Sequence, residues 1–215
     1  MKLSKVAKLC KDQMNITIIN VTRGEDNYLQ WVGTPSALYP FYNLPAMDER
    51  TAFVIFDVDE KKKPDYSFNM IDASEDFPMC LDECDETEMP VEPAHHQIVL
   101  ESRAYLVFDT SKGIRLVNRS YLAPMMSKLD ELMFFERKTA SGGIYIAAKL
   151  GLLLAGVISP TMLRREDTSM LDFSKKLYER TVYARQCQEE DAARRADPEI
   201  MLVDRQTGEV VEDEA

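Results

Sequence analysis

The stretch that decides the fold is Gly113–Pro160, GIRLVNRSYLAPMMSKLDELMFFERKTASGGIYIAAKLGLLLAGVISP. It predicts a strand over 114–117 and then a helix over 120–131, where apolar residues recur at spacings of three and four (Leu122, Met125, Met126 and Leu129). Residues 132–138 and 144–149 predict a hairpin, because the glycines of TASGG supply the positive φ that its turn needs. A close-packed apolar segment follows and ends at a proline.

The first 45 residues predict a shorter version of the same order. Residues 2–12 predict a helix with one apolar stripe (Leu3, Val6, Ala7 and Cys10), and residues 15–22 and 28–32 predict a hairpin. Residues 33–45 contain three prolines, which cannot donate to a strand ladder, so this segment predicts a buried irregular stretch or a short helical turn rather than a central strand. Shifting residues 1–45 by about 116 positions places them on 117–160, by order and length of elements rather than by residue identity.

The region between the two repeats has a different character. Residues 51–57 (TAFVIFD) predict a strand, with 66–71 as its partner across a charged turn. Residues 72–92 are dominated by acids and lack periodicity, which predicts an exposed loop. Residues 97–108 predict one long strand or two short ones.

The predicted class is therefore α+β. The main domain spans residues 1–165, and the acidic loop 72–92 belongs to it. A C-terminal helix is predicted over 166–196, and residues 197–215 predict an acidic, flexible tail with a small hairpin around QTGE.

Two segments carry a resemblance to a known family. IRLVNRSYLAPMMSKL resembles the strand-into-helix entry of the DNA sliding clamps, the family of the DNA polymerase III beta processivity clamp, and GIYIAAKLGLLLAGVISP resembles its strand running into a small-residue turn. The resemblance implies a domain of two helix-plus-antiparallel-sheet halves, related by a pseudo-twofold axis, with both helices on one side. It covers residues 1–165, and it implies a homo-oligomer because one such domain cannot close a ring. The chain also resembles uncharacterised proteins of phages and prophages of Gram-positive bacteria.

The charge of the chain restricts a role with DNA. The formal net charge is −11, so the average surface repels polyanions, and nucleic-acid binding requires locally concentrated positive charge. The first helix concentrates such charge in lysines at every third position (Lys2, Lys5, Lys8 and Lys11), which predict either a solvated face or a face turned toward phosphates. In the second helix the resemblance offers Arg119 and Lys128 for the same role.

The acidic loop offers two further hypotheses. Its carboxylates (Asp82, Glu83, Asp85, Glu86 and Glu88) resemble a run of phosphates, and so predict either an ordinary solvated loop or a surface that binds a basic partner protein. Cys80, Cys84 and His95 have the side chains that zinc prefers, although their spacing is not a standard one. Without such a site, we expect no cofactor.

No catalytic motif accompanies these residues. The sequence contains no GxSxG, Walker or GxGxxG motif, and its two histidines are adjacent. It has no signal peptide and no uncharged apolar run long enough for a membrane span, and its four cysteines predict free thiols, so we expect a cytoplasmic protein that does not bind membranes.

Three functions remain open from the sequence. The first is a non-enzymatic, sliding-clamp-like accessory or scaffold protein of phage or mobile-element DNA replication. The second is an acidic interaction module, a nucleic-acid mimic or inhibitor, that binds a basic partner protein. The third is a small metal-dependent enzyme.

Overall fold

The structure is a computed structural model, and it describes residues 2–23, 27–42, 45–73, 77–100, 102–125, 131–161, 202–203 and 210–211. For His95 and His96 it describes the backbone alone. Contacts divide the chain into two units, Met1–Leu163 and Arg164–Ala215. Of the second unit the structure describes one antiparallel strand pair, β12 (Leu202–Val203) with β13 (Val210–Val211), at the position of the hairpin predicted around QTGE. The predicted helix over 166–196 lies outside the described residues.

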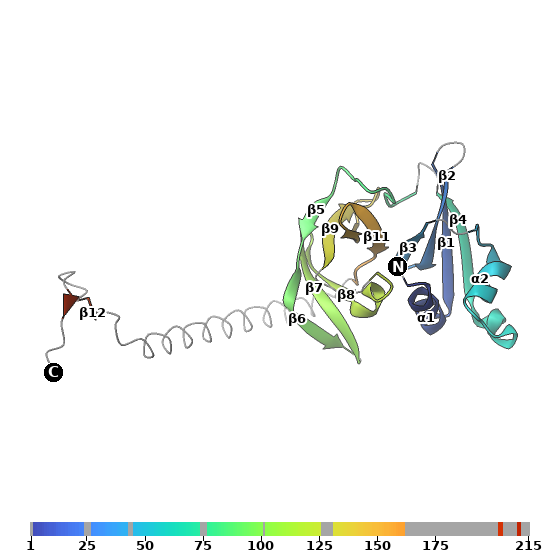
Figure 1. Cartoon of the computed structure of the whole chain (residues 1–215), viewed down its shortest axis with the longest axis horizontal. Helices are drawn as coiled ribbons and strands as arrows, with labels where there is room; N and C mark the ends of the chain where they lie inside the picture. The colour runs from blue at the N-terminus through green and yellow to red at the C-terminus, as the bar shows by residue number, and fades with distance from the viewer. Residues whose placement is uncertain are drawn as a thin grey trace. The chain divides into compact units, whose positions relative to one another are not determined.

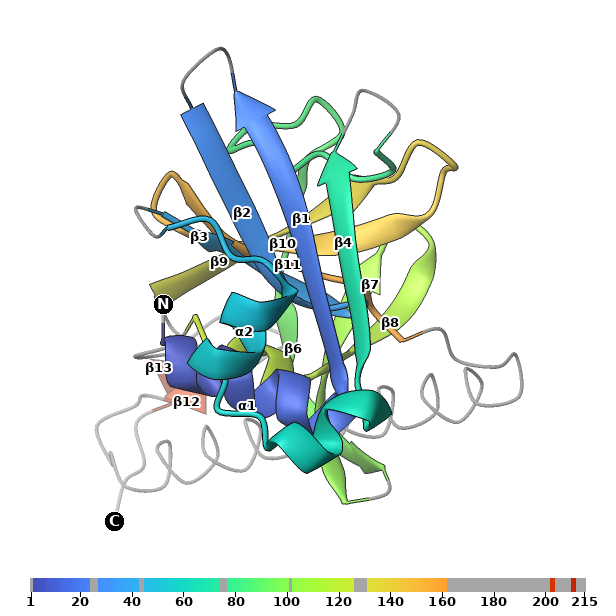
Figure 2. The ribbon, with the colours of Figure 1, turned by 90° about the vertical axis from the view of Figure 1, so that its right-hand side faces the viewer.

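The first unit is α+β and is built on an eight-stranded sheet with the order β4-β1-β2-β3-β11-β10-β9-β5 (Figures 1 and 2). The strands of its first half are β1 (Asn15–Arg23), β2 (Asn27–Thr34), β3 (Ala37–Phe41) and β4 (Ser67–Ala73). Those of its second half are β5 (Met89–Val91), β9 (Leu132–Lys138), β10 (Ile144–Leu150) and β11 (Leu153–Ile158). The halves join where β3 pairs antiparallel with β11, at Leu38 opposite Val157 and Ala37 opposite Ile158.

The repeated order of strands that the sequence predicts is present. The starts of β1 and β9, at Asn15 and Leu132, differ by 117 positions, and those of β2 and β10, at Asn27 and Ile144, also differ by 117. In each half the three strands form two successive antiparallel pairs, and the third strand is the one that meets the other half. The outer strand β4 breaks the symmetry, because it pairs parallel with β1 whereas β5 pairs antiparallel with β9.

Pro40 lies within a central strand, so the prediction of an irregular segment over 33–45 is wrong for 37–41. The strand forms because β3 is buried at every position, and its apolar residues pack on both faces of the sheet. Pro40 is tolerated because β11 pairs only with Ala37 and Leu38, which leaves the proline in a part of β3 that is paired with β2 alone.

Residues 51–57 are not a strand, because most of them belong to helix α2 (Glu49–Ile55). The carboxylate of Asp48 caps the helix by accepting a hydrogen bond from the Thr51 N–H at 2.7 Å. Ala52, Phe53 and Phe56 are buried, at a spacing that fits one helical face, whereas Val54 and Ile55 are exposed. The predicted partner strand, β4, exists, but it pairs with β1 after a 3-10 helix η1 (Glu60–Asp65).

One face of the sheet is covered by α1 (Leu3–Gln13), by α2 and by a three-stranded sheet of β6 (Pro93–Leu100), β7 (Arg103–Thr110) and β8 (Gly113–Asn118). In Figure 2, α1 and α2 lie next to each other near the lower ends of β1 and β2. Residues 97–108 thus contribute to two strands. Of the helix predicted over 120–131, the described part is a short 3-10 helix η2 (Arg119–Leu122) followed by turns, because Pro124 interrupts it; residues 126–130 lie outside the described residues.

The opposite face of the sheet is covered by residues 77–88, which we name the strap. Leu81 of the strap is buried against a cluster on the sheet that includes Trp31 and Tyr145, and Phe77 and Met79 pack on the same cluster. Residues 77–88 form a loop without helix or strand, as predicted, but the loop is not wholly exposed because Leu81 is buried. Phe77, Met79 and Leu81 stand at alternate positions and face the sheet, whereas Pro78 and Asp82 between and after them are exposed.

Candidate functional site

The predicted basic stripe of α1 winds around the helix rather than forming one face. A step of three residues turns an α-helix through about 300°, so each lysine is displaced by about 60° from the one before it. Lys2, Lys5 and Lys8 are exposed, whereas Lys11 is half-buried and its Nζ lies 3.5 Å from a carboxylate oxygen of Asp57. The outer face is therefore not wholly basic, and three lysines remain for an external anion.

The two helical segments of the repeats meet on this side of the sheet. The backbone N–H of Lys2 donates to the carbonyl oxygen of Pro124 at 2.8 Å, and the Tyr39 hydroxyl donates to the carbonyl oxygen of Tyr121 at 2.6 Å. Val6 and Cys10 of α1 and Leu122 and Met125 belong to the same buried cluster. The lysines of α1 are thus fixed beside the segment that carries Arg119. Lys128 lies outside the described residues.

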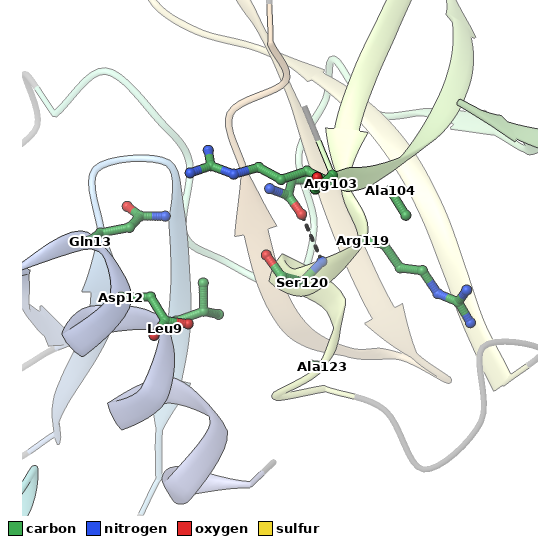
Figure 3. A pocket seen from close by; sticks show the side chains of 10 residues that line it. Leu9, Asp12, Gln13, Arg103, Ala104, Arg119, Ser120 and Ala123 are labelled. Carbon is green, nitrogen blue, oxygen red and sulfur yellow. Dashed lines mark hydrogen bonds between the residues drawn. The ribbon is translucent and has the colours of Figure 1, made fainter. Parts of the chain in front are cut away.

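A groove of about 790 Å³ opens between the C-terminal part of α1 and the ends of β7 and β8 (Figure 3). Leu9, Asp12 and Gln13 form its α1 wall, at the spacing of one helical face. The opposite wall comes from the β6–β7 turn and from the β8–η2 junction (Ser102, Arg103, Ala104, Asn118, Arg119, Ser120 and Ala123). The junction is fixed because Asn118 caps η2, accepting a hydrogen bond from the Ser120 N–H at 3.0 Å.

The two arginines of the groove differ in direction. Figure 3 shows Arg103 extending from the start of β7 toward α1, and Arg119 extending away from α1. An Nη1 of Arg119 donates to the side-chain oxygen of Gln97 on β6 at 3.2 Å. Among the residues that the structure describes, neither Arg103 nor Asp12 has a hydrogen-bond or ion-pair partner, and both are exposed. Within the described part of the groove, Arg103 is therefore the arginine without a partner, and no sequence motif marks it.

A second polar cluster lies under the strap, around Arg137 of β9. The Arg137 side chain is completely buried, and each of its five N–H groups has an acceptor. The carbonyl oxygens of Cys80, Asp82 and Glu83 accept three of them, at 3.2, 2.8 and 3.0 Å. One carboxylate oxygen of Glu88 accepts the other two. The strap is thus wrapped around a buried guanidinium.

Glu88 also joins a second cation to this cluster. Its other carboxylate oxygen accepts a hydrogen bond from Nζ of Lys149 on β10, and that ammonium lies 4.7 Å from the ring centre of Phe135. Burial alone would lower the pKa of Arg137, but the hydrogen bonds and charge of Glu88 raise it above its usual value. Arg137 therefore keeps its charge in spite of its burial, which suits a structural role.

Glu136, next to Arg137, reaches the opposite face of the sheet. It is completely buried, and its carboxylate accepts hydrogen bonds from both the backbone N–H and the hydroxyl of Ser111 in the β7–β8 turn. Sequence reasoning missed both residues. The motif FFERK could have indicated them. Neighbouring residues of a strand point to opposite faces, so an acid and a base side by side in an apolar strand predict one buried charge on each face.

The five acids predicted to bind a partner differ in their surroundings. Glu88 binds Arg137 and Lys149, Asp85 accepts from Thr87 and from the Tyr145 hydroxyl, and Glu83 accepts from the Tyr42 hydroxyl at 3.0 Å. Burial would raise the pKa of Asp85, but the hydrogen bonds of Thr87 and the charge of Arg137 lower it. Asp82 and Glu86 are exposed. A basic partner would therefore meet only part of the predicted surface.

The predicted zinc ligands are placed as follows. Cys80 is half-buried in the strap, and its Sγ lies 3.6 Å from the carbonyl oxygen of the exposed Cys84. Burial raises the pKa of the Cys80 thiol, which disfavours the thiolate that binds zinc. The side chain of His95 lies outside the described residues. Within the described part of the chain, no three His, Cys, Asp or Glu side chains gather as a metal site.

Comparison of the chain with protein-family models, with curated proteins and with solved structures found no match. Among the described residues, no helix is long and apolar enough to cross a membrane.

Proposed function

We propose that this chain is a non-enzymatic, sliding-clamp-like accessory or scaffold protein in DNA replication of a phage or other mobile element. In this role it acts in the cytoplasm as a homo-oligomer, and it holds DNA against the side of the sheet that carries α1. The proposal requires no cofactor.

The observation that carries this proposal is the pairing of the two repeats across β3 and β11. That pairing brings α1 and residues 119–125 to one side of a continuous sheet, joined by the hydrogen bond from Lys2 to Pro124. A rigid sheet backing two adjacent helical segments resembles the arrangement that the sequence suggested. The exposed lysines of α1 supply positive charge on this side in a protein whose net charge is −11.

The buried polar clusters favour a scaffold over an enzyme. Arg137, Glu88 and Glu136 are satisfied by other groups of the chain, and their bonds join the strap and the β7–β8 turn to the sheet. Groups that are already fully bonded stabilise a fixed geometry and leave few donors or acceptors for a substrate.

The experiment is a titration of fluorescently labelled duplex DNA, followed by anisotropy at several salt concentrations. The variant Lys5→Glu with Lys8→Glu should bind more weakly, and the slope of log affinity against log salt should fall by roughly two, because each neutralised phosphate contributes about 0.9. The control is Lys61→Glu with Lys62→Glu on η1, which changes the net charge by the same amount at exposed positions. Equal DNA affinity for the wild type and the Lys5/Lys8 variant would remove this function.

The mass in solution tests the assembly separately. Light scattering at low and high salt should give a closed oligomer of three or more subunits. A monomer at all concentrations would rule out encirclement of DNA, and would leave only a role as a DNA-bound scaffold.

A further inference from the structure

We propose that the groove between α1 and β7 binds a single unpaired nucleotide, with Arg103 holding its phosphate and Asp12 accepting hydrogen bonds from its base. This inference rests on the proposed function, since it specifies which part of a DNA ligand the helical side of the protein recognises. It predicts that the bound DNA has a single-stranded part.

The two walls of the groove carry opposite charges that do not meet each other. Arg103 points from β7 toward α1, Asp12 lines the facing wall, and neither has a partner within the described part of the chain (Figure 3). A ligand that satisfies both must carry an anionic group and a hydrogen-bond-donating group on opposite sides. A nucleotide has both, because its phosphate is anionic and its base presents N–H donors.

The C-terminal position of Asp12 strengthens this assignment. Asp12 and Gln13 lie in the last turn of α1, where the backbone carbonyl oxygens and the helix dipole disfavour an anion. A phosphate is therefore directed to the Arg103 wall and a donor group to the α1 wall. Guanine fits this wall best among the bases, because its N1–H and N2–H can both be donated to one carboxylate.

The floor of the groove has room for a base. Leu9, Ala104 and Ala123 are small or apolar, and the volume of about 790 Å³ lies within the range of small-molecule sites. The Watson–Crick edge of a base in a duplex is occupied by its partner, so contact with Asp12 requires an unpaired nucleotide.

The turn that carries Arg103 is held in an unusual conformation. Ser102 has a φ of 65°, in the left-handed region that favours glycine. Such backbone conformations persist where the surrounding structure imposes them, and they gather at ligand sites. Ser102 directly precedes Arg103, the first residue of β7, and both line the wall of the groove that faces α1.

Isothermal titration calorimetry with guanosine 5′-monophosphate (GMP) tests the site directly. The wild type should bind GMP, and should bind three related ligands at least about tenfold more weakly. Ribose 5-phosphate lacks the base, guanosine lacks the phosphate, and uridine 5′-monophosphate (UMP) lacks the second N–H donor of the base. Arg103→Gln should weaken GMP binding by about tenfold or more. Asp12→Asn should reduce the preference for GMP over UMP. The matched controls are Arg50→Gln and Asp65→Asn, which change exposed residues on α2 and η1.

Other results would overturn the inference. Ribose 5-phosphate binding as tightly as GMP would make the groove a general anion site, and a Gly-Gly dipeptide binding as tightly would assign it to peptide termini. Duplex binding that depends on Lys5 and Lys8, without any GMP binding, would refute this inference and leave the proposed function intact. GMP binding that requires Arg103, without any duplex binding, would support the nucleotide site and refute the proposed function.

Discussion

Arg137 and Glu88 form an ion pair that is sealed from water on one side, since the arginine side chain is completely buried and the glutamate side chain is 15% exposed. The two residues lie 49 positions apart, and their bond attaches the strap to β9. Because Lys149 uses the second carboxylate oxygen, the glutamate has no acceptor atom left without a bond. The pair therefore fixes the end of the strap to the sheet, in addition to the apolar contacts of Leu81, Phe77 and Met79.

Arg137→Leu should destabilise the protein by about 3–5 kcal/mol, because it leaves three strap carbonyls and one Glu88 carboxylate oxygen without their donor, while Lys149 still binds the other oxygen. Urea unfolding followed by circular dichroism measures this loss. The double variant Arg137→Leu with Glu88→Leu should lose less than the sum of the two single losses, because both substitutions break the same hydrogen bonds, although it also leaves the Lys149 ammonium without its carboxylate partner. If the double variant loses the sum of the two single losses, the pair does not act as a unit.

The matched control for this pair is Glu60→Gln. Glu60 pairs with Lys63 on the surface of η1, where its side chain is 84% exposed, so water screens the interaction. We expect no measurable change in the free energy of unfolding. A loss comparable to that of Arg137→Leu would show that burial is not the cause.

Glu136→Ala should separate the β7–β8 turn from the sheet. The carboxylate accepts two hydrogen bonds from Ser111, and bonds to a charged group contribute about 1.5–3 kcal/mol each, so we expect a loss of about 3–6 kcal/mol. Hydrogen exchange of the Ser111 amide should accelerate by more than that of the Thr51 amide, which is held by Asp48 on α2. Equal acceleration at both amides would indicate global destabilisation instead.

Stability should fall at alkaline pH through Cys10. Burial raises the pKa of this thiol from the usual 9.0 to about 12, so the folded protein keeps a proton that the unfolded chain releases above pH 9. The stabilisation of the folded state by the protonated thiol is complete below pH 9. It is lost above that pH, by about 1.4 kcal/mol per pH unit. Urea unfolding from about pH 8 to about pH 10.5 should show a shallower decline for Cys10→Ala than for the wild type. Parallel declines would contradict this origin.

Gly33→Ala should be strongly destabilising for a steric reason. A Cβ atom at Gly33 would lie 2.0 Å from the Ala37 carbonyl oxygen, so the β2–β3 turn would have to open, at a cost of about 3 kcal/mol or more. Gly113→Ala is the control, because nothing lies within 4 Å and only its φ of 85° is unfavourable, at about 1 kcal/mol. Thermal unfolding of the two variants compares the costs, and equal shifts in Tm would exclude the clash.

The parts of the fold that follow from local chemistry could be predicted from the sequence. The β9–β10 hairpin follows from the glycines of its turn, and α1 follows from its apolar stripe. Residues 51–55 could not be assigned by composition, because TAFVI suits a strand or a helix, and the deciding feature was the Asp48 cap. Pro40 predicts an irregular segment, but it lies in a strand. A proline is tolerated there because β11 pairs with Ala37 and Leu38 only, and the sequence does not show where that pairing stops.

The candidate sites depend more on tertiary structure. The exposed lysines of α1 could be predicted as a set, but the loss of Lys11 to Asp57 requires the position of α2. The sequence marks Arg137 as one charge among several, because its acceptors are backbone carbonyls 54–57 positions away. No sequence motif marks Arg103, and only the position of the start of β7 across the groove from α1 places it in a candidate site.

The pairing of β3 with β11 has a consequence for synthesis of the protein. β3 is complete at Phe41, but its partner is complete only at Ile158, which is 117 residues later. At a translation rate of roughly 5–20 residues per second, the ribosome needs roughly 6–23 seconds to supply it. During that interval the nascent chain carries the edge of β3 and the apolar residues beside it without cover. Until β11 is made, the half-made protein therefore has an unpaired strand edge, which is a site where other chains can pair with it.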